Sequence, residues 1–245
     1  MDPTGIFFEV HHDMPREAPD DEGSTLRALR MMKDLPASPS ILDIGCGPGA
    51  QTISLALHSA ANITAVDVHQ PFLDELDRRA GEAGVLKRVK TVNASMLELA
   101  FDAPFDALWS EGAIYVIGFT QGLRAWRPLL KHGGCMAVTE LSWIKPNPPE
   151  EVLKYWQADY PGMESVDGNL ARLRSAGYRD LGHFVLPESS WWQPYYNPMS
   201  ARIAKLREKY HADPEAQRAL DTEDLEIEMY RRYAAWYGYV FYVMQ

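Results

Sequence analysis

An apolar stretch that ends in a glycine-dense turn constrains the fold of this chain more than any other feature. Residues 41–50 read ILDIGCGPGA, and apolar residues recur at helical spacing just after them. This order predicts a buried strand, a loop and the N-terminus of a helix. Glycine lets a ligand approach the backbone closely and also tolerates positive φ. We therefore interpret residues 45–49 as a cradle for a nucleotide-like cofactor.

Strand-like and helix-like patterns alternate after this point, which predicts a parallel sheet with helices on both faces. We expect one helix capped by Ser24 and another that begins after Thr120 and stops at Gly133-Gly134. The apolar runs expected as strands are 41–44, 63–68, 89–92, 107–109 and 136–141, followed later by 179–186 and 239–243.

Four parts are expected along the chain. Residues 1–39 form an irregular N-terminal cover segment and a helix, and residues 40–190 form a cofactor-binding α/β core. Residues 191–238 form a helical insertion that acts as a lid or a dimer contact, and residues 239–245 are the final strand of the core sheet. A structured connection of this length is usually functional.

Charge and composition narrow the class of partner. The net charge of −10 argues against nucleic acid or an anionic membrane as a partner. No apolar run reaches the roughly 20 residues of a membrane span, and we expect no signal peptide. Two isolated cysteines favour a reducing cytoplasm, and no spacing of His, Asp or Glu suggests a metal.

Two cofactors compete for the glycine loop. With Ala50 as the small third residue, the loop satisfies the pattern of dinucleotide-binding proteins. However, Asp43 precedes the first glycine by two residues, and its carboxylate suits a cationic ligand or a web of loop N–H groups better than a pyrophosphate. S-adenosylmethionine carries a sulfonium and an amino group and has no phosphate.

The ordered motifs resemble those of class I S-adenosylmethionine-dependent methyltransferases. The resemblance covers roughly residues 24–143 and includes the acidic Asp67 after the second strand, the segment 94–96, the segment 105–111 and the segment 129–138. It implies a Rossmann-like, seven-stranded, mostly parallel sheet whose last strand is antiparallel. Residues 110–117 and 238–243 further resemble a little-characterised bacterial group of small-molecule methyltransferases.

The resemblance implies a set of cofactor contacts. Asp67 is expected to bind the ribose hydroxyls, Asp43 to lie near the methionine end, and Ser95 or Met96 to flank the adenine. The full set of expected cofactor-binding residues is Asp43, Gly45, Cys46, Gly47, Gly49, Asp67, Val68, Ser95, Met96 and Glu111. The reaction would leave S-adenosyl-L-homocysteine as product.

The acceptor side is less constrained, because an activated methyl group chiefly needs alignment with its nucleophile. A general base is needed only when the acceptor holds a proton. Glu111 and Tyr115 are candidate catalytic residues; the alternative for Glu111 is that it only caps the turn that follows it. The candidate substrate-pocket residues, for which simple packing or solvent exposure is the alternative, are His11, Tyr115, Trp143, Trp191 and Tyr195.

The sequence therefore favours methyl transfer to a small molecule by in-line displacement, on an O, N, S or C atom. Three alternatives stay open: a methyltransferase that acts on RNA or protein, an NAD-dependent reductase, and a regulator that binds the cofactor without catalysis. A homodimer formed through the helical insertion is a further expectation.

Overall fold

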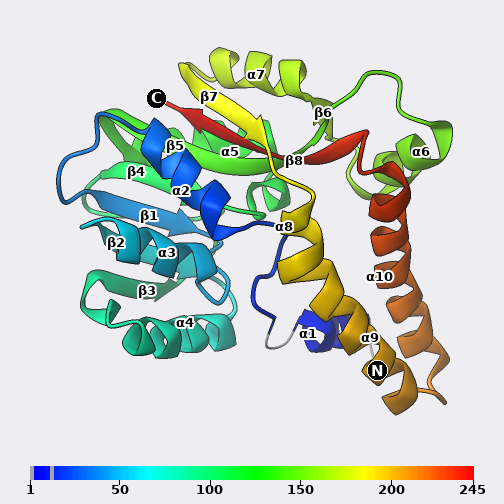
Figure 1. The fold of residues 1–245 in the computed structure, drawn as a ribbon. Helices are drawn as coiled ribbons and strands as arrows, with labels where there is room; N and C mark the ends of the chain where they lie inside the picture. Colours follow the sequence, from blue (N-terminus) through cyan, green and yellow to red (C-terminus); the bar gives the residue numbers. More distant parts are fainter. Residues whose placement is uncertain (1–2, 12–13) are drawn as a thin grey trace.

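The computed structural model describes residues 3–11 and 14–245 and is built around one mixed sheet (Figure 1). The strand order is β3-β2-β1-β4-β5-β8-β7, and β8 is antiparallel to both of its neighbours. The strands are β1 Ser40–Ile44, β2 Asn62–Asp67, β3 Val89–Asn93, β4 Phe105–Ser110, β5 Leu130–Trp143, β7 Asp180–Val185 and β8 Tyr237–Met244. A short β6, Glu164–Ser165, also pairs with β5. The predicted fold class is confirmed.

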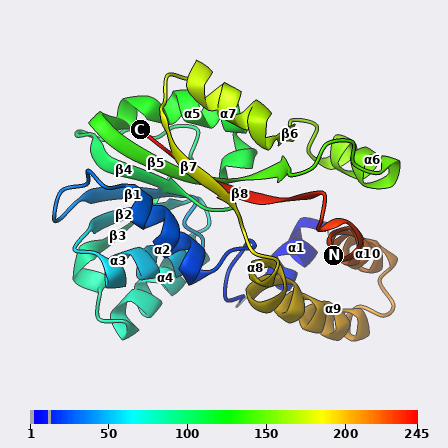
Figure 2. The same cartoon turned by 45° about the horizontal axis from the view of Figure 1, so that its top comes forward.

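Helices cover both faces of this sheet (Figure 2). In β1, Ile41 packs into the core under one group of helices, and the next residue, Leu42, packs into the core on the opposite face. Burial of both faces explains why the strands are near-continuous apolar runs. One face carries α2 (Glu22–Met31), α3 (Ala50–His58) and α4 (Gln70–Glu82), and the other carries α5 (Phe119–Trp126) and α7 (Val166–Ser175).

Two predicted helix boundaries are wrong. The side chain of Asp21, rather than that of Ser24, caps α2 and accepts a hydrogen bond from the Ser24 backbone N–H. Helix α5 ends at Trp126, well before Gly133, because Pro128 has no N–H to continue the helical hydrogen bonds. Leu130 and Gly133-Gly134 therefore belong to β5.

A third packed unit lies beyond the carboxyl end of the central strands. It contains α6 (Glu150–Asp159), α8 (Ser189–Trp191), a π-helical turn (Trp192–Tyr196), α9 (Asn197–Lys209) and α10 (Pro214–Tyr233). These helices confirm a helical insertion, which extends from 189 to 233. The final strand begins at Tyr237, two residues before the predicted boundary.

The N-terminal segment is partly helical, whereas the sequence predicted an irregular start. Helix α1, Pro3–His11, lies against α9 and α10 in both views (Figures 1 and 2). Its Ile6 and Val10 side chains are buried in the same core as the insertion helices. Among the described residues, no helix is long and apolar enough to cross a membrane.

Candidate cofactor and acceptor site

The glycine loop after β1 has the backbone conformation that only glycine adopts readily. Gly45, Gly47 and Gly49 have φ values of 72°, 52° and 83°. A Cβ added at Gly45 would lie 2.4 Å from the Cβ of Ala113, and one at Gly49 would lie 2.1 Å from Leu76 Cδ1. The glycines therefore serve the close packing of the loop as well as the approach of a ligand.

A cavity of about 360 Å³ lies beside this loop, at the carboxyl ends of the parallel strands. Gly49 is not part of its wall, because this residue turns into α3 and packs on Leu76. The predicted cofactor residues that do line the cavity are Gly45, Cys46, Gly47, Asp67, Val68, Met96 and Glu111. The structure thus brings most of the predicted set together around one space.

Asp67 is fixed at the edge of the cavity by backbone donors. Its Oδ2 accepts a hydrogen bond from the Gly47 N–H at 3.0 Å, and its Oδ1 accepts one from the His69 N–H at 2.9 Å. The carboxylate therefore links the glycine loop to the end of β2. This position is suited to accept hydrogen bonds from the vicinal hydroxyls of a ribose.

Besides Gly49, two predicted cofactor residues lie outside the cavity wall. Asp43 is fully buried beneath the loop and accepts hydrogen bonds from Thr52 Oγ1 at 2.6 Å and from Gln51 Nε2 at 3.4 Å. Burial raises the pKa of Asp43 to about 7. Ser95 instead accepts a hydrogen bond from the Leu97 N–H and stabilises a turn. Neither side chain forms part of the wall of this cavity.

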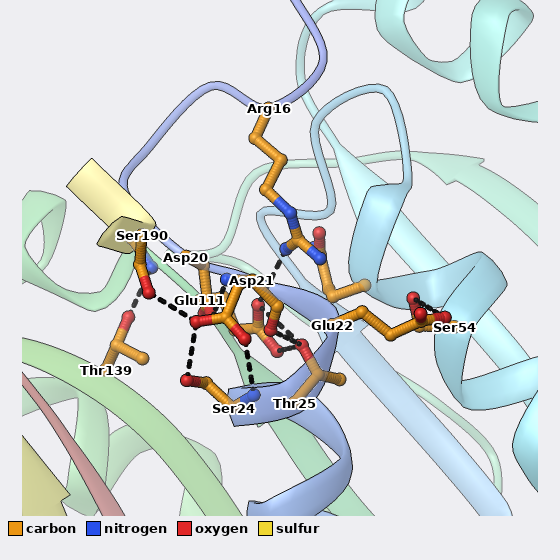
Figure 3. A network of polar contacts seen from close by, with 12 residues as sticks. Arg16, Asp20, Asp21, Glu22, Ser24, Thr25, Ser54, Glu111, Thr139 and Ser190 are labelled. Atoms are coloured by element: carbon orange, nitrogen blue, oxygen red, sulfur yellow. Dashed lines mark hydrogen bonds and ion pairs between the residues drawn. The ribbon is translucent and has the colours of Figure 1, made fainter. Parts of the chain in front are cut away.

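Glu111 follows β4 and is the centre of a polar network (Figure 3). Its carboxylate accepts hydrogen bonds from Trp109 Nε1 at 2.6 Å, from Thr25 Oγ1 at 3.0 Å and from Arg16 Nη1 at 3.2 Å. Asp20 lies in the same network and is only 2% exposed. Burial, followed by the charge of Glu111, raises the pKa of Asp20 well above its ordinary value. Arg16 and Asp20, which line the same cavity, had no recognisable motif in the sequence.

A second cavity, of about 380 Å³, adjoins the first. Phe7, Glu17, Ala18, Gly112 and Tyr115 line both cavities, so the two spaces share part of their wall. Among the predicted substrate-pocket residues, those in this wall are His11, Tyr115, Trp191 and Tyr195.

Trp143 does not line either cavity. It packs edge-to-face against Tyr237, with ring centroids 6.2 Å apart. It lies on β5 directly opposite that residue in β8, so the pairing of the two strands places its side chain in the helical core.

His11 is buried, which excludes the solvent-facing alternative. Its Nε2 lies 3.3 Å from the hydroxyl of Tyr195, and its Nδ1 lies 2.9 Å from the backbone oxygen of Phe7. Burial lowers the pKa of His11, so the imidazole is neutral at neutral pH. The neighbouring His12 lies outside the described residues.

Sequence reasoning missed the carboxyl groups of the second cavity. Glu17, Asp159, Glu223 and Glu226 all line it. Burial raises the pKa of Glu17 to about 8 and that of Glu223 to about 7. The only signal was the spacing of Glu223 and Glu226, which places them on one face of α10. Within the described part of the chain, no group of three or more His, Cys, Asp or Glu side chains is arranged to hold a metal.

A family model matches the segment that contains the glycine loop and strands β1 to β4. Residues 41–134 match the model of a methyltransferase domain. The chain carries a class I S-adenosylmethionine-dependent methyltransferase domain. The matched region contains the glycine loop, Asp67 and Glu111, and the remaining residues supply the insertion and the last strands of the sheet.

Relatives by sequence are distant. The 27-O-demethylrifamycin SV methyltransferase of Amycolatopsis mediterranei is 27% identical over 78% of this chain and 74% of its own length. The uncharacterised Escherichia coli protein YjhP is 26% identical over 88% of this chain and 86% of its own length.

Solved structures share the whole methyltransferase architecture. An S-adenosylmethionine-dependent methyltransferase from Geobacter sulfurreducens, solved with S-adenosyl-L-homocysteine, aligns over 98% of this chain and 97% of its own at a TM-score of 0.84 and 20% identity. A methyltransferase from Thiobacillus denitrificans, solved with the same ligand, aligns over 100% of this chain and 99% of its own at 0.84 and 22% identity. The likeness includes the helical insertion.

Proposed function

We propose that this methyltransferase transfers the methyl group of S-adenosylmethionine to a small molecule bound in the second cavity. The observation that carries the proposal is the shared wall of the two cavities at Glu17, Gly112 and Tyr115. A donor in the first cavity and an acceptor in the second would meet there. The name of the rifamycin-modifying relative, which denotes a small-molecule acceptor, is consistent with this proposal.

The residues of the first cavity fit the methyl donor. Asp67 would accept hydrogen bonds from the ribose hydroxyls, and Val68 and Met96 would flank the adenine with apolar surface. The wall also carries Glu17 and Glu111. Carboxylates favour a donor that bears a sulfonium and an amino group, and they disfavour the pyrophosphate of a dinucleotide.

Methyl transfer requires alignment of the acceptor with the methyl group more than activation of the donor. The bound donor supplies a methyl group on a sulfonium, which an acceptor lone pair takes by in-line displacement while sulfur keeps the electrons of the broken bond. The enclosed walls orient the acceptor and exclude water. Where the acceptor atom holds a proton, Glu17 is the carboxyl at the junction that can receive it.

The two candidate catalytic residues take different roles in this proposal. Glu111 lines only the first cavity, where Trp109, Thr25 and Arg16 hold its carboxylate. We assign it to cofactor binding and to the ordering of the N-terminal segment. Tyr115 lines both cavities, so we place it at the point of methyl transfer.

The insertion and α1 form a cover over the acceptor in this proposal. Trp191, Tyr195, Glu223 and Glu226 come from the insertion, and His11 comes from α1, yet all five line the second cavity. A wall built in this way favours a lid over a dimer contact and limits the size of the acceptor. The two buried free cysteines are consistent with a reducing, cytoplasmic environment.

Transfer of labelled methyl groups tests the proposed function. The protein would be incubated with methyl-labelled S-adenosylmethionine and with either the low-molecular-mass or the macromolecular fraction of a cell extract. We expect label in the low-molecular-mass fraction, and none when Asp67 is replaced by alanine at a limiting donor concentration. Label confined to RNA or protein would contradict the small-molecule acceptor.

A further inference from the structure

The second cavity has an unbalanced charge. Glu17, Asp159, Glu223 and Glu226 line it, and among the described residues no Lys or Arg side chain does. Oε1 of Glu226 accepts a hydrogen bond from the Tyr196 hydroxyl at 2.9 Å. By contrast, Glu111 in the first cavity forms an ion pair with Arg16.

Aromatic side chains form much of the remaining wall. They include Tyr155, Trp191, Tyr195 and Tyr239, which come from α6, α8, the π-helical turn and β8. Aromatic faces attract organic cations, and the attraction grows when the site is shielded from water. Carboxylates and several aromatic rings around one space form the combination that recognises substituted ammonium groups.

Two buried donors in this wall, the indole N–H groups of Trp156 and Trp191, are also without a partner among the described residues. Trp191 is 2% exposed, and its indole N–H makes no hydrogen bond with any described residue. Buried polar groups are seldom left in this state.

We propose that the acceptor of this methyltransferase is a small organic cation, an amine of single-ring size or smaller, held by Glu223, Glu226 and the surrounding aromatic side chains. This inference rests on the proposed function and narrows it to one substrate class.

The electrostatic state of the cavity supports a cationic occupant. Burial raises the pKa of Glu223 to about 7 and raises that of Glu226 above its ordinary value, because ionised carboxyl groups lack a compensating charge there. An ammonium group would restore that charge, whereas a carboxylate or phosphate ligand would add to the repulsion. A bare metal ion is a poorer occupant, because the described residues contain no group of three or more metal ligands.

Binding of matched probes tests the inference without any turnover. Protein saturated with S-adenosyl-L-homocysteine would be titrated with phenethylammonium, 2-phenylethanol and phenylacetate, which differ mainly in charge. We expect the cation to bind about tenfold or more tightly than the neutral alcohol and the anion to bind weakest. Equal affinity for the three probes, or preference for the anion, would overturn the inference.

Variants of the two carboxyl residues on α10 show where the probe binds. Glu226→Gln and Glu223→Gln keep the size of each side chain and remove its charge, and we expect each to weaken phenethylammonium binding severalfold while 2-phenylethanol binding stays constant. Glu215→Gln is the matched control, because it makes the same change at an exposed position of α10 outside the cavity. Equal effects at Glu215 and Glu226 would mean that the probe binds elsewhere.

The charge of the methylated product distinguishes this inference from the proposed function. Its measurement needs only the wild-type protein. Labelled small-molecule products from the transfer experiment would be passed over cation- and anion-exchange resins. Retention on the cation exchanger is the expected result. Label in neutral or anionic small molecules would uphold the proposed function and overturn the cationic acceptor, whereas label only in macromolecules would overturn both.

Discussion

Nη1 of Arg16 lies 3.2 Å from Oε2 of Glu111 and joins the N-terminal segment to the end of β4. The two side chains are only 11% and 4% exposed. Both line the cofactor cavity, so the ion pair couples the folding of residues 14–20 to the shape of that cavity. The N-terminal segment is thereby part of the wall of the first cavity.

Removal of Arg16 should destabilise the fold and weaken cofactor binding together. In Arg16→Met the carboxylate of Glu111 stays buried beside Asp20 without its cationic partner, and we expect a loss of about 2–4 kcal/mol in the free energy of unfolding. Urea denaturation measures this loss. Arg232→Met breaks an exposed ion pair with Glu151 and should cost less than about 1 kcal/mol. Equal losses of unfolding free energy in Arg16→Met and Arg232→Met would contradict the coupling between the N-terminal segment and the first cavity.

Loss of the Asp67 carboxylate should weaken binding of S-adenosyl-L-homocysteine. The cost of losing charge-assisted hydrogen bonds to a shielded ligand is about 1–3 kcal/mol. Isothermal titration calorimetry of Asp67→Ala measures it, with Asp74→Ala as control because Asp74 is exposed on the neighbouring α4. Unchanged affinity in Asp67→Ala would refute the ribose assignment.

Glu140 should make stability fall as pH rises. This residue of β5 is fully buried, and its Oε1 accepts a hydrogen bond from Tyr160, whereas its Oε2 has no partner in the described part of the chain. Burial raises its pKa from 4.5 to about 8. Between these values the folded state binds more protons than the unfolded state, so the stabilisation is full below pH 4.5 and is lost as pH rises through about 8.

Glu140→Gln removes this titration. Relative to the wild type, we expect the variant to gain stability across that pH range by up to roughly 1 kcal/mol per pH unit. Urea denaturation between pH 5 and pH 8.5 gives the two slopes. Glu151→Gln, at an exposed site, should keep the wild-type slope. If Glu140→Gln also kept it, the buried carboxyl would not be the titrating group.

The contact between His11 and Tyr195 should hold the cover closed. It joins α1 to the π-helical turn across the second cavity, with 3.3 Å between His11 Nε2 and the Tyr195 oxygen. Tyr195→Phe should lower stability by about 0.5–1.5 kcal/mol. Hydrogen exchange should show faster exchange in α1 and α9, with no change in β1. Faster exchange spread evenly over the chain would argue against a local cover.

The core of the fold was predictable because its signals are local. The run 41–44 and the glycines that follow it specify a strand and a loop with positive φ, whatever packs on them. Asp67 was predictable for the same reason, since it ends the next strand. The positions of Asp43 and Ser95 outside the cavity wall were not predictable, because a motif gives the position of a residue along the chain, and nearby donors such as Thr52 decide where its side chain lies.

The acceptor cavity was only partly predictable, because its wall comes from segments far apart in the sequence. His11, Glu17, Tyr115 and Glu226 meet only after α1 packs on α10. Trp143 and Trp191 are both tryptophans near the same edge of the sheet, yet only Trp191 lines the cavity. That difference depends on strand pairing and helix packing, which no local pattern encodes.

A crystal structure of the protein with S-adenosyl-L-homocysteine would show directly whether the methyl donor binds in the first cavity with its sulfur facing the second. We predict that the ribose hydroxyls lie within hydrogen-bonding distance of Asp67 and that the sulfur faces the shared wall at Tyr115 and Gly112, open to the second cavity. A ligand bound outside the first cavity, or a sulfur directed away from the second cavity, would contradict the account.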